Sequence, residues 1–71
     1  MNIKRIKNYL LYKTGSKIIV VYNGTRNRRE RYCGILLKVY NNVFIIRTNN
    51  NNNIKSFNII DILTKTIQLY I

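Results

Sequence analysis

Residues 2–13 place apolar side chains at helical spacing. Ile3, Ile6 and Leu10 recur at intervals of three and four residues, so they form one stripe of an α-helix with Tyr9 beside it. Asn2 suits the N-cap of such a helix, and Gly15 suits its C-terminal stop. The opposite side carries Lys4, Arg5, Asn8 and Tyr12. The pattern therefore predicts a short amphipathic helix at the start of the chain.

After this helix the chain changes to short runs rich in β-branched and aromatic residues. Such runs predict strands, here at residues 17–22, 31–40, 43–48, 54–60 and 64–71. Asn23-Gly24 and Asn41-Asn42 are turn signals, and the asparagines at 49–53 predict a loop. The last segment alternates apolar Ile67, Leu69 and Ile71 with Thr66, Gln68 and Tyr70, which is typical of a half-buried strand.

The predicted strand at 31–40 has apolar residues on both faces. Cys33, Ile35, Leu37 and Val39 oppose Leu36 and Tyr40. A flat ribbon cannot bury both faces, whereas a strongly bent sheet that closes into a small barrel can, with the helix covering one end. Gly34 marks a bulge or sharp bend. We predict a single, mainly β domain over residues 1–71, with the helix in 1–14 and a five-stranded barrel in 15–71.

The charge of the chain points to an acidic partner. Thirteen Lys and Arg residues face only two acids, which leaves a net charge of +11. Such a surface attracts anions, and nucleic acid is the leading candidate, ahead of an acidic protein surface or an anionic membrane. Four of the six arginines lie between residues 26 and 31. An AT-rich genome can raise the lysine content of a protein, but it does not account for a cluster of arginines.

The arginine cluster is the strongest candidate site. Guanidinium groups bind phosphate in a bidentate manner, and a flexible basic loop can follow a phosphate backbone. Tyr32 adds a ring on which a base could stack, because we expect Cys33 on the opposite, buried face. Lys4 and Arg5 of the helix would extend the basic surface. The alternative is a solvated hairpin loop without a partner. The predicted nucleic-acid site comprises Arg26, Arg28, Arg29, Arg31, Tyr32, Lys4 and Arg5.

Other chemistry is not supported by the residues present. The chain has no histidine and a single cysteine, so we expect no metal site, no cofactor and no activated thiol. Glu30 and Asp61 do not form a catalytic pair in the sequence. We therefore expect a binding protein and not an enzyme. No apolar stretch approaches the length of a membrane span or a signal peptide, and we expect a cytoplasmic location.

The sequence also resembles the Veg family of low-GC Gram-positive bacteria. The resemblance rests on Asn23-Gly24, the basic loop, Gly34-Ile35-Leu36, Tyr40, Val43-Phe44-Ile45-Ile46 and Asp61-Ile62-Leu63-Thr64 with Thr66, and it covers residues 3–70. It implies a small Sm-like or SH3-like barrel behind an N-terminal helix. It also implies a regulatory role in biofilm formation, through a transcriptional repressor and without catalytic residues. The chain departs from the family in being more basic and in having Asn41 where proline is common.

Two classes of function stay open at this point. The first is a nucleic-acid-binding protein, with RNA favoured over DNA. The second is a protein-interaction module of the Veg type that modulates a transcriptional repressor. We also expect that a homodimer could form through the last strand, because 66–71 would lie at an edge of the sheet.

Overall fold

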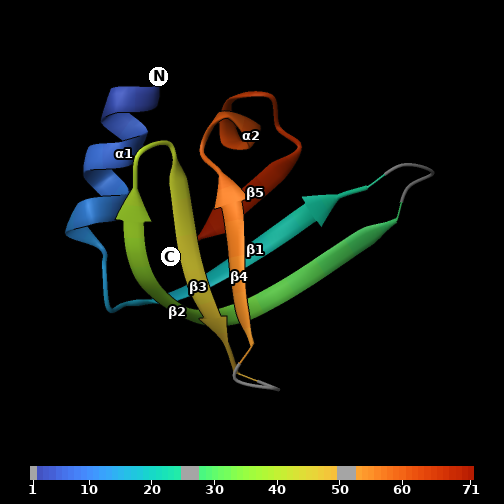
Figure 1. Cartoon of the computed structure of the whole chain (residues 1–71). Coiled ribbons are helices and arrows are strands. Elements are labelled where there is room, and N and C mark those ends of the chain that lie inside the picture. The colour runs from blue at the N-terminus through green and yellow to red at the C-terminus, as the bar shows by residue number, and fades with distance from the viewer. Residues whose placement is uncertain (1, 25–27, 50–52) are drawn as a thin grey trace.

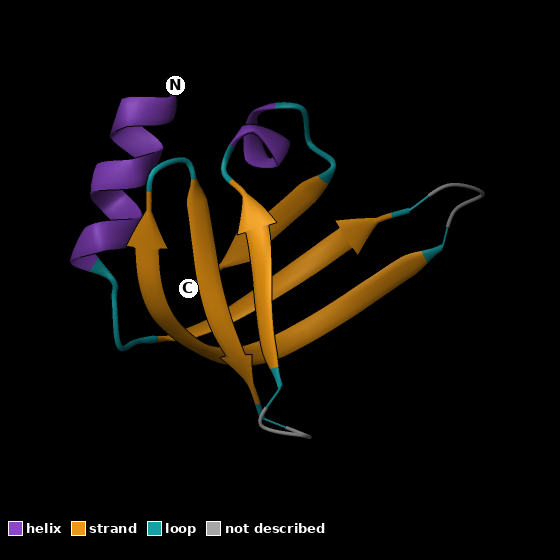
Figure 2. Cartoon of the chain, viewed as in Figure 1, coloured by secondary structure: helices purple, strands orange, loops and turns teal. Residues whose placement is uncertain are grey.

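The computed structural model describes residues 2–24, 28–49 and 53–71, and in these ranges the chain is mainly β (Figure 1). An N-terminal helix precedes five strands, and a second, very short helix separates the last two strands (Figure 2). This element order confirms the predicted fold class. The elements are α1 (Ile3–Tyr12), β1 (Lys17–Asn23), β2 (Arg29–Tyr40), β3 (Val43–Thr48), β4 (Ile54–Asn58), α2 (Ile60–Leu63) and β5 (Ile67–Tyr70).

Helix α1 begins and ends where its sequence predicts. The side chain of Asn2 accepts a hydrogen bond from the backbone N–H of Arg5 at 2.9 Å, which satisfies one of the free donors of the first turn. Ile6 and Leu10 are buried against the sheet. After the helix, Gly15 has a φ of 91° and donates its N–H to the carbonyl of Leu36 at 2.7 Å. This bond ties the end of α1 to the middle of β2.

The five strands form one antiparallel sheet in the order β4-β3-β2-β1-β5. Strand β2 is the longest, and it serves both halves of the sheet. Residues 29–35 pair with β1, whereas residues 34–40 pair with β3. Figure 1 shows that β2 curves strongly between these two pairings, so that β3 and β4 turn away from the direction of β1. The strongly bent sheet predicted from the sequence is therefore present.

The predicted closure of this sheet into a barrel does not occur. Within the described part of the chain, the outer strands β4 and β5 each pair with a single neighbour and not with each other. The segment expected to be a strand over residues 54–60 stops at Asn58, because Ile60–Leu63 turns into α2. Ile59 between them is fully buried, and its N–H donates to the carbonyl of Asn42 at 2.8 Å. Helix α2 lies in the connection between β4 and β5 and contacts both strands.

A bulge explains the two apolar faces of β2. The pairing with β3 shifts register between Leu36 and Lys38, so Leu37 is the extra residue. Before the bulge the even-numbered residues face the core, and after it Val39 does, which is why Leu36 and Val39 are both buried. Cys33 consequently lies on the opposite, outer face and is only half-buried, which corrects its predicted place in the core.

The core lies between the bent sheet and α1. Phe44 is fully buried at its centre, and its ring stacks on that of Phe57 with centroids 5.4 Å apart. Both ends of the chain contribute to this core, so residues far apart in sequence hold one another in place. The buried residues are Ile6, Leu10, Ile18, Val20, Leu36, Val39, Phe44, Ile46, Ile59 and Ile67.

The starts of two strands differ from their predictions. Strand β2 begins at Arg29 instead of residue 31, because Asn23 pairs with Arg29 and continues the ladder outward. Strand β5 begins at Ile67 instead of residue 64, since α2 and the left-handed Lys65, with a φ of 62°, take up the preceding residues. The hairpin turn at Asn41 is confirmed, and its φ of 53° is one that asparagine tolerates.

Gly34 is required by a close backbone contact and not by the bulge. A Cβ atom at this position would lie 2.0 Å from the carbonyl oxygen of Arg47 and 2.8 Å from its carbonyl carbon. Neither atom can move without breaking the pairing of β2 with β3. The bulge itself lies further along β2, at Leu37. Glycine therefore allows β3 to approach the point at which β2 bends.

We predict that Gly34→Ala lowers the free energy of unfolding by about 3 kcal/mol or more, because the added carbon overlaps backbone atoms. Gly15→Asn is the matched control, since nothing lies within 4 Å of a Cβ there and asparagine tolerates a positive φ. Chemical denaturation of both variants measures the difference. Equal midpoints for Gly34→Ala and the wild type would contradict the steric argument.

Candidate nucleic-acid interface

Strands β1 and β2 form a ribbon that projects from the rest of the molecule (Figure 1). Their pairing runs from Lys17–Ile35 at the base to Asn23–Arg29 at the outer end. Asn23 anchors this end to the segment before β5: its side-chain amide donates to the carbonyl of Lys65 at 3.1 Å, and its backbone N–H donates to that of Thr66 at 2.8 Å. The ribbon is thus held at a defined angle to the core.

The predicted arginine loop is partly a strand. Arg29 and Arg31 belong to β2 and pair with Asn23 and Val21, so these two positions are corrected from a flexible loop to a regular ladder. Arg28 directly precedes the strand, and its carbonyl accepts the N–H of Gly24 at 2.7 Å. All three side chains are exposed. Arg26, the fourth member of the predicted cluster, lies outside the described residues.

Alternation along β2 separates the predicted site residues onto two faces. Arg29 and Arg31 share the outer face of the sheet with Cys33. Glu30 and Tyr32 share the other face, which continues into the core at Leu36. Two neighbouring guanidinium groups therefore project to the same side. Within the described part of the chain, no arginine side chain takes part in a hydrogen bond, so their donors are available to a ligand.

Tyr32 lies on the inner face, so its predicted orientation away from the core is wrong. Its hydroxyl donates a hydrogen bond to the carboxylate of Glu30. Its ring lies 5.7 Å from the ring of Phe57, and the Nζ of Lys55 lies 5.3 Å from its centroid. The bond to Glu30, with a smaller contribution from burial, raises the pKa of Tyr32 above its ordinary value of 10.0. The hydroxyl and the ring of Tyr32 are thus already in contact with other residues of the protein, which leaves less of the ring free to stack on a base.

The sheet brings another tyrosine to the outer face, beside the arginines. Tyr70 of β5 pairs with Ile19 of β1, and Val21 of β1 pairs with Arg31 of β2. These four residues line a shallow hollow of about 390 Å³, in which Tyr70 is 55% exposed. The alternation of β5 had placed Tyr70 on its polar face. The sequence had no signal that Arg31 would be its neighbour, because a third strand lies between them.

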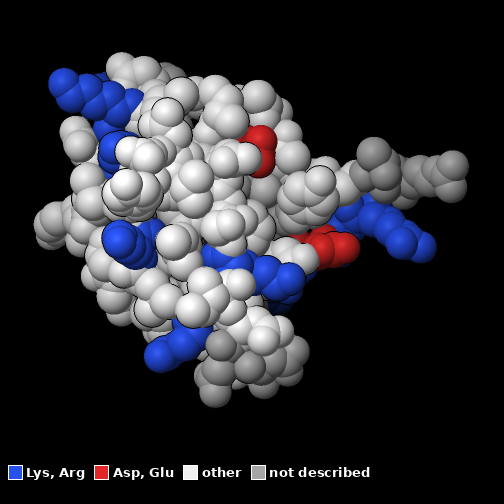
Figure 3. Space-filling model, in the orientation of Figure 1, with Lys and Arg blue, Asp and Glu red and all other residues white. Residues whose placement is uncertain are grey.

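The structure does not bring Lys4 and Arg5 together with the ribbon. Both are exposed on α1, which lies at the opposite side of the molecule from the end of the ribbon (Figure 1). Figure 3 shows the Lys and Arg atoms of one face in separate groups, divided by uncharged surface, with acidic atoms near the group on the ribbon. Any ligand that used all the predicted residues would have to wrap around the molecule.

The described ranges offer little for other kinds of site. They contain no group of three or more His, Cys, Asp or Glu side chains placed to hold a metal ion. They also contain no helix of the length and apolar character needed to cross a bilayer. The thiol of Cys33 is half-buried beside Ile19 of β1, its partner across the ladder, and the chain has no histidine that could activate it.

We predict that the Tyr32 hydroxyl titrates above pH 10.0 in the folded protein and that Glu30→Gln lowers its pKa. Because the folded-state pKa is raised, the bond stabilises the fold below the unfolded-state pKa, and this contribution disappears as the pH rises through the folded-state pKa. NMR of labelled tyrosine rings, with Tyr32→Phe to assign the signal, measures the titration. An unchanged Tyr32 pKa in Glu30→Gln would show that the bond is not the cause.

Comparison with known proteins agrees with the resemblance of the sequence. No curated protein matches the chain. A family model described as "Biofilm formation stimulator VEG" matches residues 1–70 of the 71-residue chain. The match includes α1, the ribbon with its arginines, and all of β5. Because the model spans almost the whole chain, this protein belongs to the Veg family of biofilm formation stimulators.

Proposed function

We propose that this protein binds nucleic acid, with RNA favoured, through the outer face of the β1–β2 ribbon. The family is described as stimulating biofilm formation, so the broad role is regulatory. The proposal adds a direct ligand to that role. The observation that carries it is the hollow in which Arg31 of β2 and the exposed Tyr70 of β5 lie together, next to Arg29.

Electrostatics favours an anionic polymer as the ligand. The net charge of +11 attracts phosphates at long range, and the exposed guanidinium groups of Arg28, Arg29 and Arg31 are suited to bidentate phosphate contacts. Because the hydrogen bonds of Asn23 hold its outer end, the ribbon would present these groups without a large loss of entropy on binding.

Tyr70 would supply the contact to a base. An exposed ring between β-branched side chains offers a flat surface, and stacking on such rings is independent of base identity. Arg31 in the same hollow would bind the adjoining phosphate. In this arrangement Tyr70 takes the role that the sequence assigned to Tyr32. A single strand with unstacked bases fits best, which is why RNA is favoured.

Binding and not catalysis is the proposed activity, and its location would be the cytoplasm, where transcripts are. The same cations could instead bind an acidic surface on a transcriptional repressor, which is the second class open from the sequence. No contact among the described residues favours that alternative over nucleic acid. Self-association through β5 also stays a prediction: one edge of β5 pairs with β1, and no described strand pairs with the other.

We predict that a fluorescein-labelled single-stranded RNA binds with an affinity that falls steeply with salt. Arg29→Gln/Arg31→Gln should reduce the slope of log K against log salt by about 1.4, at about 0.7 for each lost phosphate contact. Tyr70→Leu should weaken binding by about 1–3 kcal/mol with the slope unchanged, because stacking releases no counterions. Fluorescence anisotropy over a salt series measures both effects.

The matched control for the arginine pair is Lys7→Gln/Lys38→Gln. It removes the same charge from α1 and from the part of β2 that pairs with β3, away from the outer end of the ribbon. If this control flattened the slope as much as the arginine pair, binding would depend on total charge and not on the ribbon. Absence of RNA binding by the wild type at 150 mM salt, a moderate ionic strength with a Debye length of about 8 Å, would reject the proposal. The repressor-binding alternative would then take its place.

A further inference from the structure

A second hollow lies on the inner face of the sheet, opposite the face that carries Arg29 and Arg31. It has a volume of about 530 Å³ and opens between α1 on one side and α2 and β5 on the other. It exists because β4 and β5 do not pair, which leaves the mouth of the bent sheet uncovered except by the two helices. Its volume is in the range of sites that bind small molecules. The lining residues are Arg5, Ile6, Tyr9, Leu10, Ile62 and Leu69.

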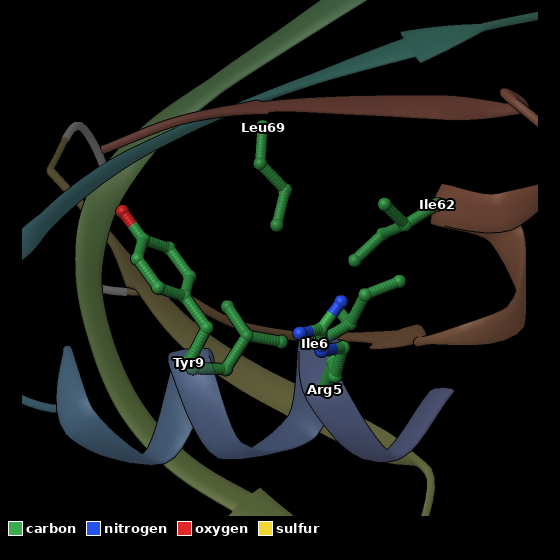
Figure 4. Close-up of a pocket in the computed structure, with 6 residues that line it drawn as sticks. Arg5, Ile6, Tyr9, Ile62 and Leu69 are labelled. Carbon is green, nitrogen blue, oxygen red and sulfur yellow. The ribbon is translucent and has the colours of Figure 1, made fainter. Parts of the chain in front are cut away.

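Apolar side chains line this hollow both on the α1 side and on the side formed by α2 and β5. Ile6 and Leu10 of α1 form its floor and are almost fully buried, whereas Ile62 and Leu69 are only half-buried. Figure 4 shows Leu69 and Ile62 directed across the hollow toward the helix, with open space between them and α1. In a well-packed core these side chains would meet. An apolar body placed here would remove their remaining surface from water, which is favourable.

The polar side chains that line this hollow include a cation but no acid. Arg5 and Tyr9 lie one turn apart on α1, both line the hollow, and both are exposed (Figure 4). The Nζ of Lys13 lies 5.8 Å from the centroid of the Tyr9 ring, which adds a second positive charge on the same side of the helix. No lining residue carries a carboxylate. A ligand with a single negative group would therefore find a charge-assisted partner at Arg5.

We propose that this hollow binds a small amphipathic anion, namely a carboxylate with a medium-length aliphatic body. The carboxylate would accept hydrogen bonds from the guanidinium group of Arg5, and the chain would lie between Leu10 and Leu69. The proposal does not rest on nucleic-acid binding, because none of the lining residues is one that the proposed function uses. It assigns to Arg5 a role different from the phosphate contact expected from the sequence. It also makes the open sheet a functional feature of the fold.

Decanoate is the probe, and two-dimensional amide NMR of the full chain is the measurement. We expect saturable shifts of signals from α1, α2 and β5, with those of the outer ribbon unchanged. Decanol and decyltrimethylammonium have a similar alkyl chain but no negative charge. Both should bind at least about tenfold more weakly than decanoate, because loss of a charge-assisted hydrogen bond lowers the affinity by about that factor. Equal binding of all three would overturn the assignment of an anion.

Two variants test the residues. Arg5→Gln should weaken decanoate binding at least about tenfold, whereas Lys4→Gln removes the same charge from the neighbouring residue, which does not line the hollow, and should leave it unchanged. Leu69→Phe should reduce binding by filling the hollow, and circular dichroism would show that the variant is folded. Equal effects of Arg5→Gln and Lys4→Gln, or no saturable binding by the wild type at millimolar decanoate, would reject the proposal.

Discussion

The close approach of β3 to β2 at Gly34 is the constraint on which the rest of the structure depends. With no side chain at this position, the carbonyl of Arg47 can lie where a Cβ would otherwise be. Gly34 and Ile35 are also the two residues of β2 that pair with both β1 and β3. The two halves of the sheet therefore meet at the residue that permits the tightest packing. The bend and the bulge at Leu37 together direct Leu36 and Val39 into one core.

The bend leaves two surfaces with different properties. On one side, the part of β1 and β2 that extends past the core becomes a ribbon with exposed arginines. On the other, β4 ends at Asn58 and α2 intervenes, so the sheet stays open and α1 covers only part of the gap. The two proposed sites follow from these two features. The ribbon presents charge to a polymer, whereas the open side presents an apolar hollow with one cation.

Register across three strands decides which groups can act together on the ribbon. Arg31 and Tyr70 lie far apart in the sequence, yet β1 brings them to one hollow through its pairs with β2 and β5. Tyr32 is adjacent to Arg31 in sequence but lies on the other face, where Glu30, Phe57 and Lys55 contact it. Residues that are adjacent along a strand point to opposite faces of the sheet, whereas residues that are paired across two strands share a face.

The sequence alone determined the local features of this protein, because they depend on neighbouring residues. Examples are the helix capped by Asn2, the hairpin at Asn41, the strand over 43–48, the excess of positive charge and membership of the Veg family. Only the tertiary structure decided that Cys33 faces outward and Tyr32 inward, that Arg29 and Arg31 belong to a strand, and that the sheet stays open. The physical reason is that one bulge reverses the faces of a strand, and one buried residue, Ile59, ends β4 in favour of α2. The position of the bulge and the end of β4 both depend on packing between residues far apart in the sequence, so they cannot be predicted from the spacing of residues along the chain.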